Sequence, residues 1–77
     1  MSMTAGSTYN IIELVGSSRN SWEEAAQNAI ATASSRLTNV RIAEIAELDS
    51  KIEGGRIAEY RVKIRISFKV EIEPETL

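Results

Sequence analysis

The chain has 77 residues, 43% of them hydrophobic, and 9 Lys and Arg against 11 Asp and Glu give a net charge of −2. This length makes one domain with a marginal core, because a chain this short buries only about 60% of its unfolded surface. The sequence contains no cysteine and no histidine, which excludes disulfides, thiolate metal sites and the Ser-His-Asp and Cys-His catalytic arrangements.

The N-terminal part predicts an arm followed by a strand. Residues 1–7 lack the charged and apolar regions of a signal peptide, and we expect a flexible N-terminal arm. Residues 8–15 (TYNIIELV) are rich in β-branched and aromatic types and end at Gly16-Ser17-Ser18, which indicates a strand and then a loop.

A helix is predicted from Trp22 to Leu37. Ser21 can cap its first turn, and Glu24 can return a hydrogen bond to the Ser21 amide, as in a capping box. The apolar residues behind this box recur with helical spacing, at Trp22, Ala25, Ala26, Ala29, Ile30, Ala33 and Leu37. Because this stripe is mostly alanine, the helix can lie close to the surface that it covers.

Two more strands complete a β-α-β-β order. Residues 40–53 are typical of an extended segment, and Gly54-Gly55 predicts a two-residue turn because glycine supplies the positive φ angles of type I′. The last strand, Tyr60 to Ile72, alternates apolar residues with mainly basic ones and ends at Pro74. We therefore expect a folded domain over residues 8–73 and a tail over residues 74–77.

The turn also predicts which residues face each other. Without a bulge, Ile45 faces Ile64 on the helix side of the sheet, and Glu44 faces Arg65 on the other side. The side away from the helix then carries Ile42, Glu44, Ala46, Leu48, Arg61, Lys63 and Arg65.

One helix is too short to cover this sheet. The last strand would extend about 43 Å at ~3.3 Å per residue, whereas the helix would extend about 24 Å. The uncovered apolar ends predict contacts between subunits, the usual remaining way to complete a small core.

The sequence resembles the dodecin family. The resemblance rests on IELVGSS (residues 12–18), SWEEA (21–25), YRVKI (60–64) and SFKV (67–70), and it runs from about Tyr9 to Glu71. It implies an α+β fold in which a three-stranded antiparallel sheet wraps partly around one helix, and twelve subunits that form a hollow assembly. Family members that bind flavins store or sequester them, with no substrate turnover.

Two positions depart from the flavin-binding pattern. The family's flavin-stacking tryptophan corresponds to Ile42, and its flavin-contacting glutamine corresponds to Arg61. Together with Glu44, two residues after Ile42, they are the candidate ligand-binding positions. Isoleucine offers no π-face, and arginine donates hydrogen bonds without accepting any. An arginine here would suit a phosphate or carboxylate better than a neutral ring. Alternatively, the basic strand pairs with Glu44, Glu47 or acids of a neighbouring subunit.

A second subgroup of the family, which lacks the tryptophan and is associated with calcium, is the more similar one. The similarity rests on RIA (residues 41–43) and on Tyr60-Arg61. Glu47 corresponds to an acidic position near a three-fold axis in the family, and it shares a strand face with Asp49. Together they could contribute to a calcium or magnesium site, or they could simply be solvated or salt-bridged acids.

These observations favour a non-enzymatic protein that binds and stores a small ligand of the flavin type, riboflavin, FMN or FAD. The alternative is a structural assembly that is stabilised by calcium or magnesium and binds no flavin. The only other partner expected is the chain itself, as a homododecamer. The small net charge does not indicate nucleic acid, no apolar run approaches the ~20 residues of a membrane span, and a cytoplasmic location is expected.

Overall fold

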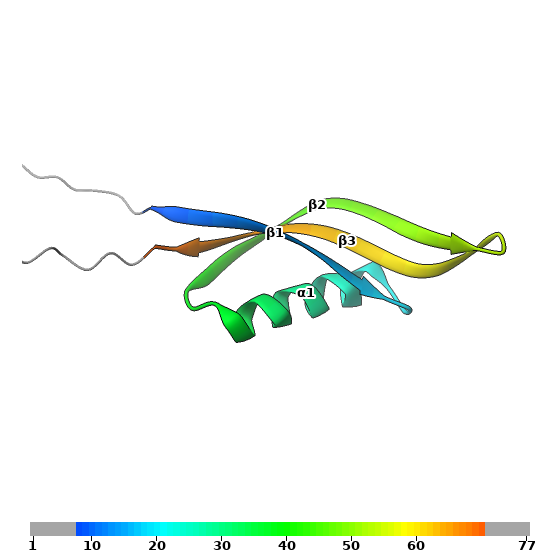
Figure 1. Ribbon diagram of the computed structural model, residues 1–77, viewed down its shortest axis with the longest axis horizontal. Coiled ribbons are helices and arrows are strands. Elements are labelled where there is room, and N and C mark those ends of the chain that lie inside the picture. The colour runs from blue at the N-terminus through cyan, green and yellow to red at the C-terminus, as the bar shows by residue number, and fades with distance from the viewer. Residues whose placement is uncertain (1–7, 71–77) are drawn as a thin grey trace, which may run out of the picture.

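The computed structural model describes residues 8–70 and has the predicted β-α-β-β order (Figure 1). Its elements are β1 (Tyr9–Ser18), α1 (Trp22–Arg36), β2 (Val40–Glu53) and β3 (Arg56–Lys69). The strands form one antiparallel sheet in the order β1-β3-β2, so that β3 is central and β1 and β2 are its edges. The helix packs on one face, and the β2–β3 hairpin extends past its end as an arm.

The strand and helix bounds differ from the predicted ones in three places. β1 runs through Gly16 to Ser18, because Ser17 and Ser18 still pair with β3. β3 starts at Arg56, directly after the turn, and not at Tyr60. The helix ends at Arg36, and Leu37 is its extended C-cap residue. The predictions for residues 1–7 and 71–77 fall outside the described residues.

The predicted N-cap is present, but the capping box is only half formed. Ser21 has extended backbone angles, and its hydroxyl oxygen accepts the Glu24 amide at 2.9 Å. The Glu24 carboxylate does not return to the Ser21 amide. It accepts hydrogen bonds from the Ser18 hydroxyl and from Asn20 Nδ2 instead, so that it joins the end of β1 to the first turn of α1.

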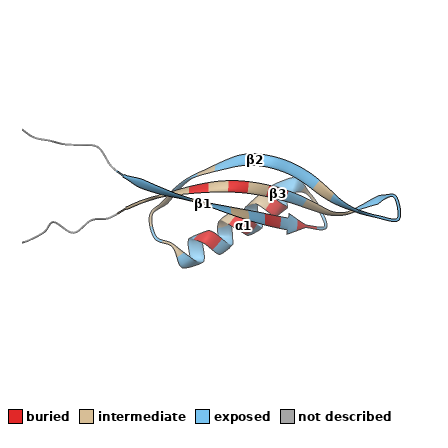
Figure 2. Ribbon diagram, turned by 45° about the horizontal axis from the view of Figure 1, so that its top comes forward, coloured by how far each residue is buried: buried red, intermediate tan, exposed pale blue. Residues whose placement is uncertain are grey.

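The core lies between the alanine stripe of the helix and the middle of β3 (Figure 2). Its buried members are Ala25, Ala29, Ala33, Val62, Ile64 and Ile66. Gly16 allows this close approach, since a Cβ there would collide with the Ala25 carbonyl oxygen and lie 2.9 Å from Ala29 Cβ. The small alanine side chains therefore set the distance between helix and sheet.

The β2–β3 register agrees with the prediction near the turn and in the middle of the sheet, where Ile45 faces Ile64 and Glu44 faces Arg65. Between these two regions the pairing is shifted by one residue, with irregularities at Ile45/Glu47 and Lys51/Ile52. Leu48 consequently faces Val62, a helix-side residue. The prediction that Leu48 lies on the side away from the helix was wrong, because an antiparallel slip of one residue exchanges the two faces.

The arm and the free edge leave large apolar side chains uncovered. Ile45, Leu48, Ile52 and Ile57 are each 45–57% exposed, and β2 is almost entirely exposed in Figure 2. The described residues span 63 × 21 × 15 Å. The shape is thus a rod with a core at its centre, and one helix does not cover the sheet.

Candidate functional site

The candidate site lies on the outer face, by which we mean the sheet face turned away from α1. Cross-strand rows give its layout, because residues that face each other across an antiparallel sheet point to the same side. Four rows run from β1 through β3 to β2: Ile11–Ser67–Ile42, Glu13–Arg65–Glu44, Val15–Lys63–Glu47 and Ser17–Arg61–Asp49. Ile42, Glu44 and Arg61 lie on this face, as expected, and the shifted register adds Glu47 to them.

Each base of β3 in these rows is paired with an acid of a neighbouring strand. Lys63 Nζ lies 3.6 Å from Glu47. Arg65 lies between two acids, with Nε 2.8 Å from Glu13 and Nη1 3.5 Å from Glu44. The hydrogen bond to Glu13 is the main cause of a raised pKa of Arg65. These three bases of β3 are therefore neutralised within one subunit.

Arg61 makes the most complete pair of the outer face. Its Nε donates to Asp49 Oδ1 at 2.8 Å, and its Nη2 donates to Asp49 Oδ2 at 3.3 Å. This two-point hydrogen bond lowers the pKa of Asp49 and raises the pKa of Arg61. Both groups are therefore charged around neutral pH.

Sequence reasoning did not identify Asp49 as the partner of Arg61. The bulge-free register placed Leu48 opposite Arg61, whereas the structure places Asp49 there. A usable signal was present in the charges. When the register is moved by one residue, three pairs of oppositely charged residues face each other: Glu47–Lys63, Asp49–Arg61 and Lys51–Glu59.

Ile42 lies in an exposed apolar part of the outer face. It faces Ser67, which also faces Ile11 on the other edge. Ile42 is 61% exposed and Ile11 is 62% exposed. The pair offers a flat apolar surface, with one hydroxyl between its two members.

The structure does not bring Ile42 and Arg61 together within one subunit. The row of Ile42 meets β3 at Ser67, six residues from Arg61, or about 20 Å at ~3.3 Å per residue. A ligand of flavin size that contacts both positions needs them from two different subunits.

Glu47 and Asp49 share one face, as expected, and the shifted register makes it the outer face, but they are not joined in a metal site. Each faces its own base, Lys63 or Arg61. Within residues 8–70, no three acidic side chains gather closely enough to hold a metal ion. A cation at Glu47 would need ligands from more than one subunit.

Trp22 has the packing role expected of it. Its ring meets Tyr60 edge-on, with 4.8 Å between ring centroids. Its Nε1 donates to the Asp49 backbone carbonyl at 2.9 Å. These contacts fix the start of α1 to the base of the arm, and they place Trp22 far from Ile42.

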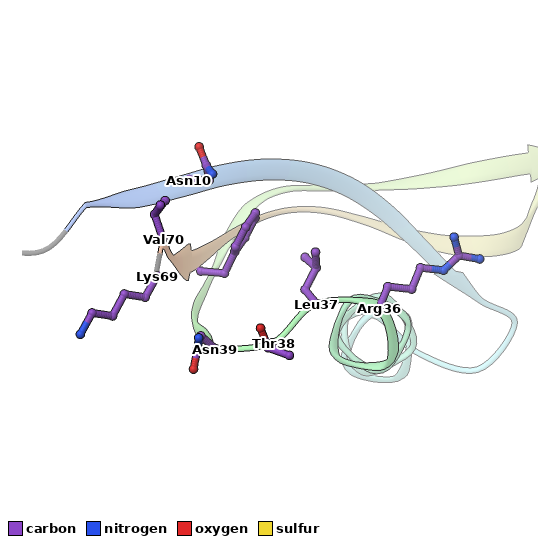
Figure 3. Close-up of a pocket in the computed structure, with 8 residues that line it drawn as sticks. Asn10, Arg36, Leu37, Thr38, Asn39, Lys69 and Val70 are labelled. Carbon is purple, nitrogen blue, oxygen red and sulfur yellow. The ribbon is translucent and has the colours of Figure 1, made fainter. Parts of the chain in front are cut away.

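A cavity of about 400 Å³ lies at the other end of the helix (Figure 3). Arg36, Leu37, Asn39 and Lys69 are among the residues that line it. The two basic side chains point away from each other in Figure 3. They do not converge on a common point, so the cavity has no arrangement that would hold an anion.

The described residues contain no helix that is long and apolar enough to cross a membrane.

Comparison with known proteins gives consistent matches. A family model described as dodecin matches residues 8–71. The chain is 34% identical over 64 residues to the calcium dodecin of Mycobacterium tuberculosis, covering 83% of this chain and 90% of that protein. It is 33% identical over 66 residues to the dodecin of Thermus thermophilus, covering 86% and 96%.

Solved structures show the same fold. The dodecin from Streptomyces coelicolor superposes with a TM-score of 0.84 at 28% identity, covering 91% of this chain and all of that one. The calcium dodecin from Mycobacterium tuberculosis, described as having a novel calcium-binding site, gives a TM-score of 0.76 at 31% identity over 91% of this chain and all of that one.

Proposed function

The chain belongs to the dodecin family, and from that premise we propose that it is a non-enzymatic subunit of a homododecamer that binds and sequesters a small ligand. The observation that supports this most directly is the outer face. It presents an exposed apolar surface at Ile42 and, at Arg61, a hydrogen-bond donor that Asp49 holds in place. The two are too far apart to serve one ligand within one subunit, which favours a pocket shared between subunits.

The ligand that we propose is a flavin-type ring. An apolar face at Ile42 can cover the flat ring, and guanidinium N–H groups can donate to its carbonyl edge. The full sequence contains no histidine and no cysteine, and the site that we describe supplies no nucleophile with an adjacent base. Binding without turnover is the role that these side chains support.

A native mass measurement and a riboflavin titration test this proposal together. We expect a mass of about twelve subunits, and quenching of riboflavin fluorescence that saturates on titration. A monomer in solution would refute the assembly. A dodecamer that leaves riboflavin fluorescence unchanged would refute the flavin-type ligand and keep the assembly.

An ion-stabilised assembly is the second candidate, because a relative that is 34% identical is a calcium dodecin. Glu47 suits this role best among the acids of the outer face. It is 64% exposed, and its contact to Lys63 is the longest of the base–acid pairs there. Copies of Glu47 around a symmetry axis could supply the several oxygen ligands that calcium requires.

Chelation distinguishes this candidate from the first. If calcium or magnesium holds subunits together, EDTA should lower the melting temperature of the assembly, and added calcium should restore it. A Glu47→Gln variant should then be insensitive to EDTA. An unchanged melting temperature of the unmodified protein with EDTA would count against the ion-stabilised assembly.

A further inference from the structure

The contact between Asp49 and Arg61 determines which ligands the position of Arg61 can accept. The inference drawn from it rests on the proposed function, since it takes Arg61 as a ligand contact. A guanidinium group has five N–H donors in a planar fork. Two of them are bound by Asp49, through Nε and Nη2. The other three have no partner among the described residues and lie at the far side of the fork.

Asp49 is itself held in place from the helix. Its backbone carbonyl accepts the Trp22 indole N–H at 2.9 Å, and the Trp22 ring packs against Tyr60, the residue before Arg61. The main-chain bond does not depend on the Asp49 side chain. The carboxylate is therefore presented to Arg61 by a backbone that α1 fixes, which limits how far the exposed pair can separate.

The bases in the rows on either side of this pair already have acidic partners. Lys63 is the neighbouring base on the same face of β3, and it is paired with Glu47. On the other side Glu59 faces Lys51, whose ammonium group lies 3.5 Å from Glu53. An anion that approaches Arg61 would thus meet a carboxylate already on the guanidinium, and a second carboxylate, Glu59, two residues away on the same strand. A neutral carbonyl oxygen would meet free N–H donors without that repulsion.

We infer that Asp49 is a specificity-determining positioning residue, which cancels the charge of Arg61 and orients its free N–H groups so that the site takes neutral carbonyl-bearing rings and rejects phosphates and carboxylates. The arginine type alone suggested the opposite preference. The preference is reversed by Asp49 on the neighbouring strand, which the shifted register places opposite Arg61.

Titration calorimetry with inorganic phosphate tests this inference without any flavin. The unmodified oligomer should show no phosphate binding that depends on Arg61. Asp49→Asn keeps the shape and removes the charge, so it should gain phosphate binding, and adding Arg61→Gln should abolish the gain. Phosphate binding by the unmodified protein that Arg61→Gln removes would overturn the inference, as would an Asp49→Asn variant without any gain.

A comparison of riboflavin with FMN measures the selectivity between a neutral and an anionic ligand, because the two differ only by a phosphate. Asp49→Asn should shift the ratio of their dissociation constants toward FMN by about 1.4- to fivefold, the range expected of exposed ion pairs. Asp49→Glu should restore the original ratio. Glu13→Gln is the matched control, because it removes the same charge from the same face and leaves Arg65 with Glu44. An equal shift in that control would overturn the specific role of Asp49.

Native mass and Trp22 emission report whether each variant is folded and assembled, and Asp49→Ser replaces Asp49→Asn if the latter does not assemble. The proposed function and the role of Asp49 can be refuted independently of each other. If neither flavin binds but the phosphate results hold, the flavin-type ligand is wrong and the exclusion of anions by Asp49 stands. If flavins bind and the phosphate results are absent, the proposed function stands and the role of Asp49 is wrong.

Discussion

At the scale of single residues, Ile42 is a proposed ligand contact whose effect can be measured alone. Ile42 lies on the exposed apolar surface, where we propose that the ring of the ligand rests. It buries nothing in the core of its own subunit, so replacing it changes the surface without disturbing the fold. The place of Ile42 on the outer face could be predicted from the sequence.

We predict that Ile42→Trp strengthens riboflavin binding. An aromatic face at this position should stack on the ring and contribute about 1–3 kcal/mol, the scale of base–aromatic stacking. Fluorescence quenching on titration measures the change. Ile11→Trp is the control, since Ile11 lies in the same row and is equally exposed. If both variants bind riboflavin equally well, Ile42 is not the stacking position.

Gly16 is a residue whose importance the sequence did not reveal. It was expected in a loop, but it is buried within β1 against the helix. We predict that Gly16→Ala destabilises the fold by about 1–3 kcal/mol or more, the range for overpacked cores, because the helix must move away from the sheet. Ser17→Ala, at the exposed neighbouring position, should change stability by about 0.5 kcal/mol or less. Urea unfolding measures both, and similar values for the two would contradict the close contact.

At the scale of elements, α1 could be predicted nearly to its ends, whereas the sheet register could not. The helix has a clear cap and a regular apolar spacing, and both signals are local. The register between β2 and β3 has three irregularities that no local residue pattern marks, and two of them decide the face of Leu48 and the partner of Arg61. The pair Glu44–Arg65 was predicted correctly, but the partners of Lys63 and Arg61 were not, because pairing is a property of two strands together.

The junction between β1 and α1 should be sensitive to acid. Hydrogen bonds from Ser18 and then Asn20 lower the pKa of Glu24 below 4.5. A lowered pKa in the folded state adds stability above the unfolded pKa, and this contribution is lost as pH falls below about 4.5 through the folded value. We predict that Glu24→Gln is less stable than the unmodified protein at pH 6 and that the difference shrinks by pH 3. Thermal unfolding across this range measures it, and a constant difference would contradict the prediction.

At the scale of the whole molecule, the exposed apolar surface supports the proposed assembly. A rod of 63 × 21 × 15 Å with a core of six buried side chains leaves most of β2 and the arm exposed. The length and composition predicted a core that is too small to stabilise the chain alone. The comparison of strand and helix lengths predicted that the helix leaves the ends of the sheet uncovered. The sequence did not show that the arm presents Leu48 on the helix side, because that depends on the shifted register.

We predict that Leu48→Asp reduces the native mass of the protein. Leu48 is 55% exposed in one subunit, and a charge there would be buried without a partner if a neighbouring subunit covers it. Native mass spectrometry should show smaller species that keep their helix and strand signals in circular dichroism. Gln27→Glu adds the same charge on an exposed helix position and should leave the mass unchanged. An intact assembly with Leu48→Asp would show that this side chain is not covered.

The irregular pairing along β2 has a consequence for the newly made chain. A single subunit carries a free edge strand of 14 residues with several exposed apolar side chains, which is the kind of segment that stacks into fibrils. The interruptions at Val40/Ile42, Ile45/Glu47 and Lys51/Ile52 divide that edge into short regular stretches. Bulges of this kind twist an edge away from flat pairing, so they should guard the subunit against aggregation while it waits to be incorporated.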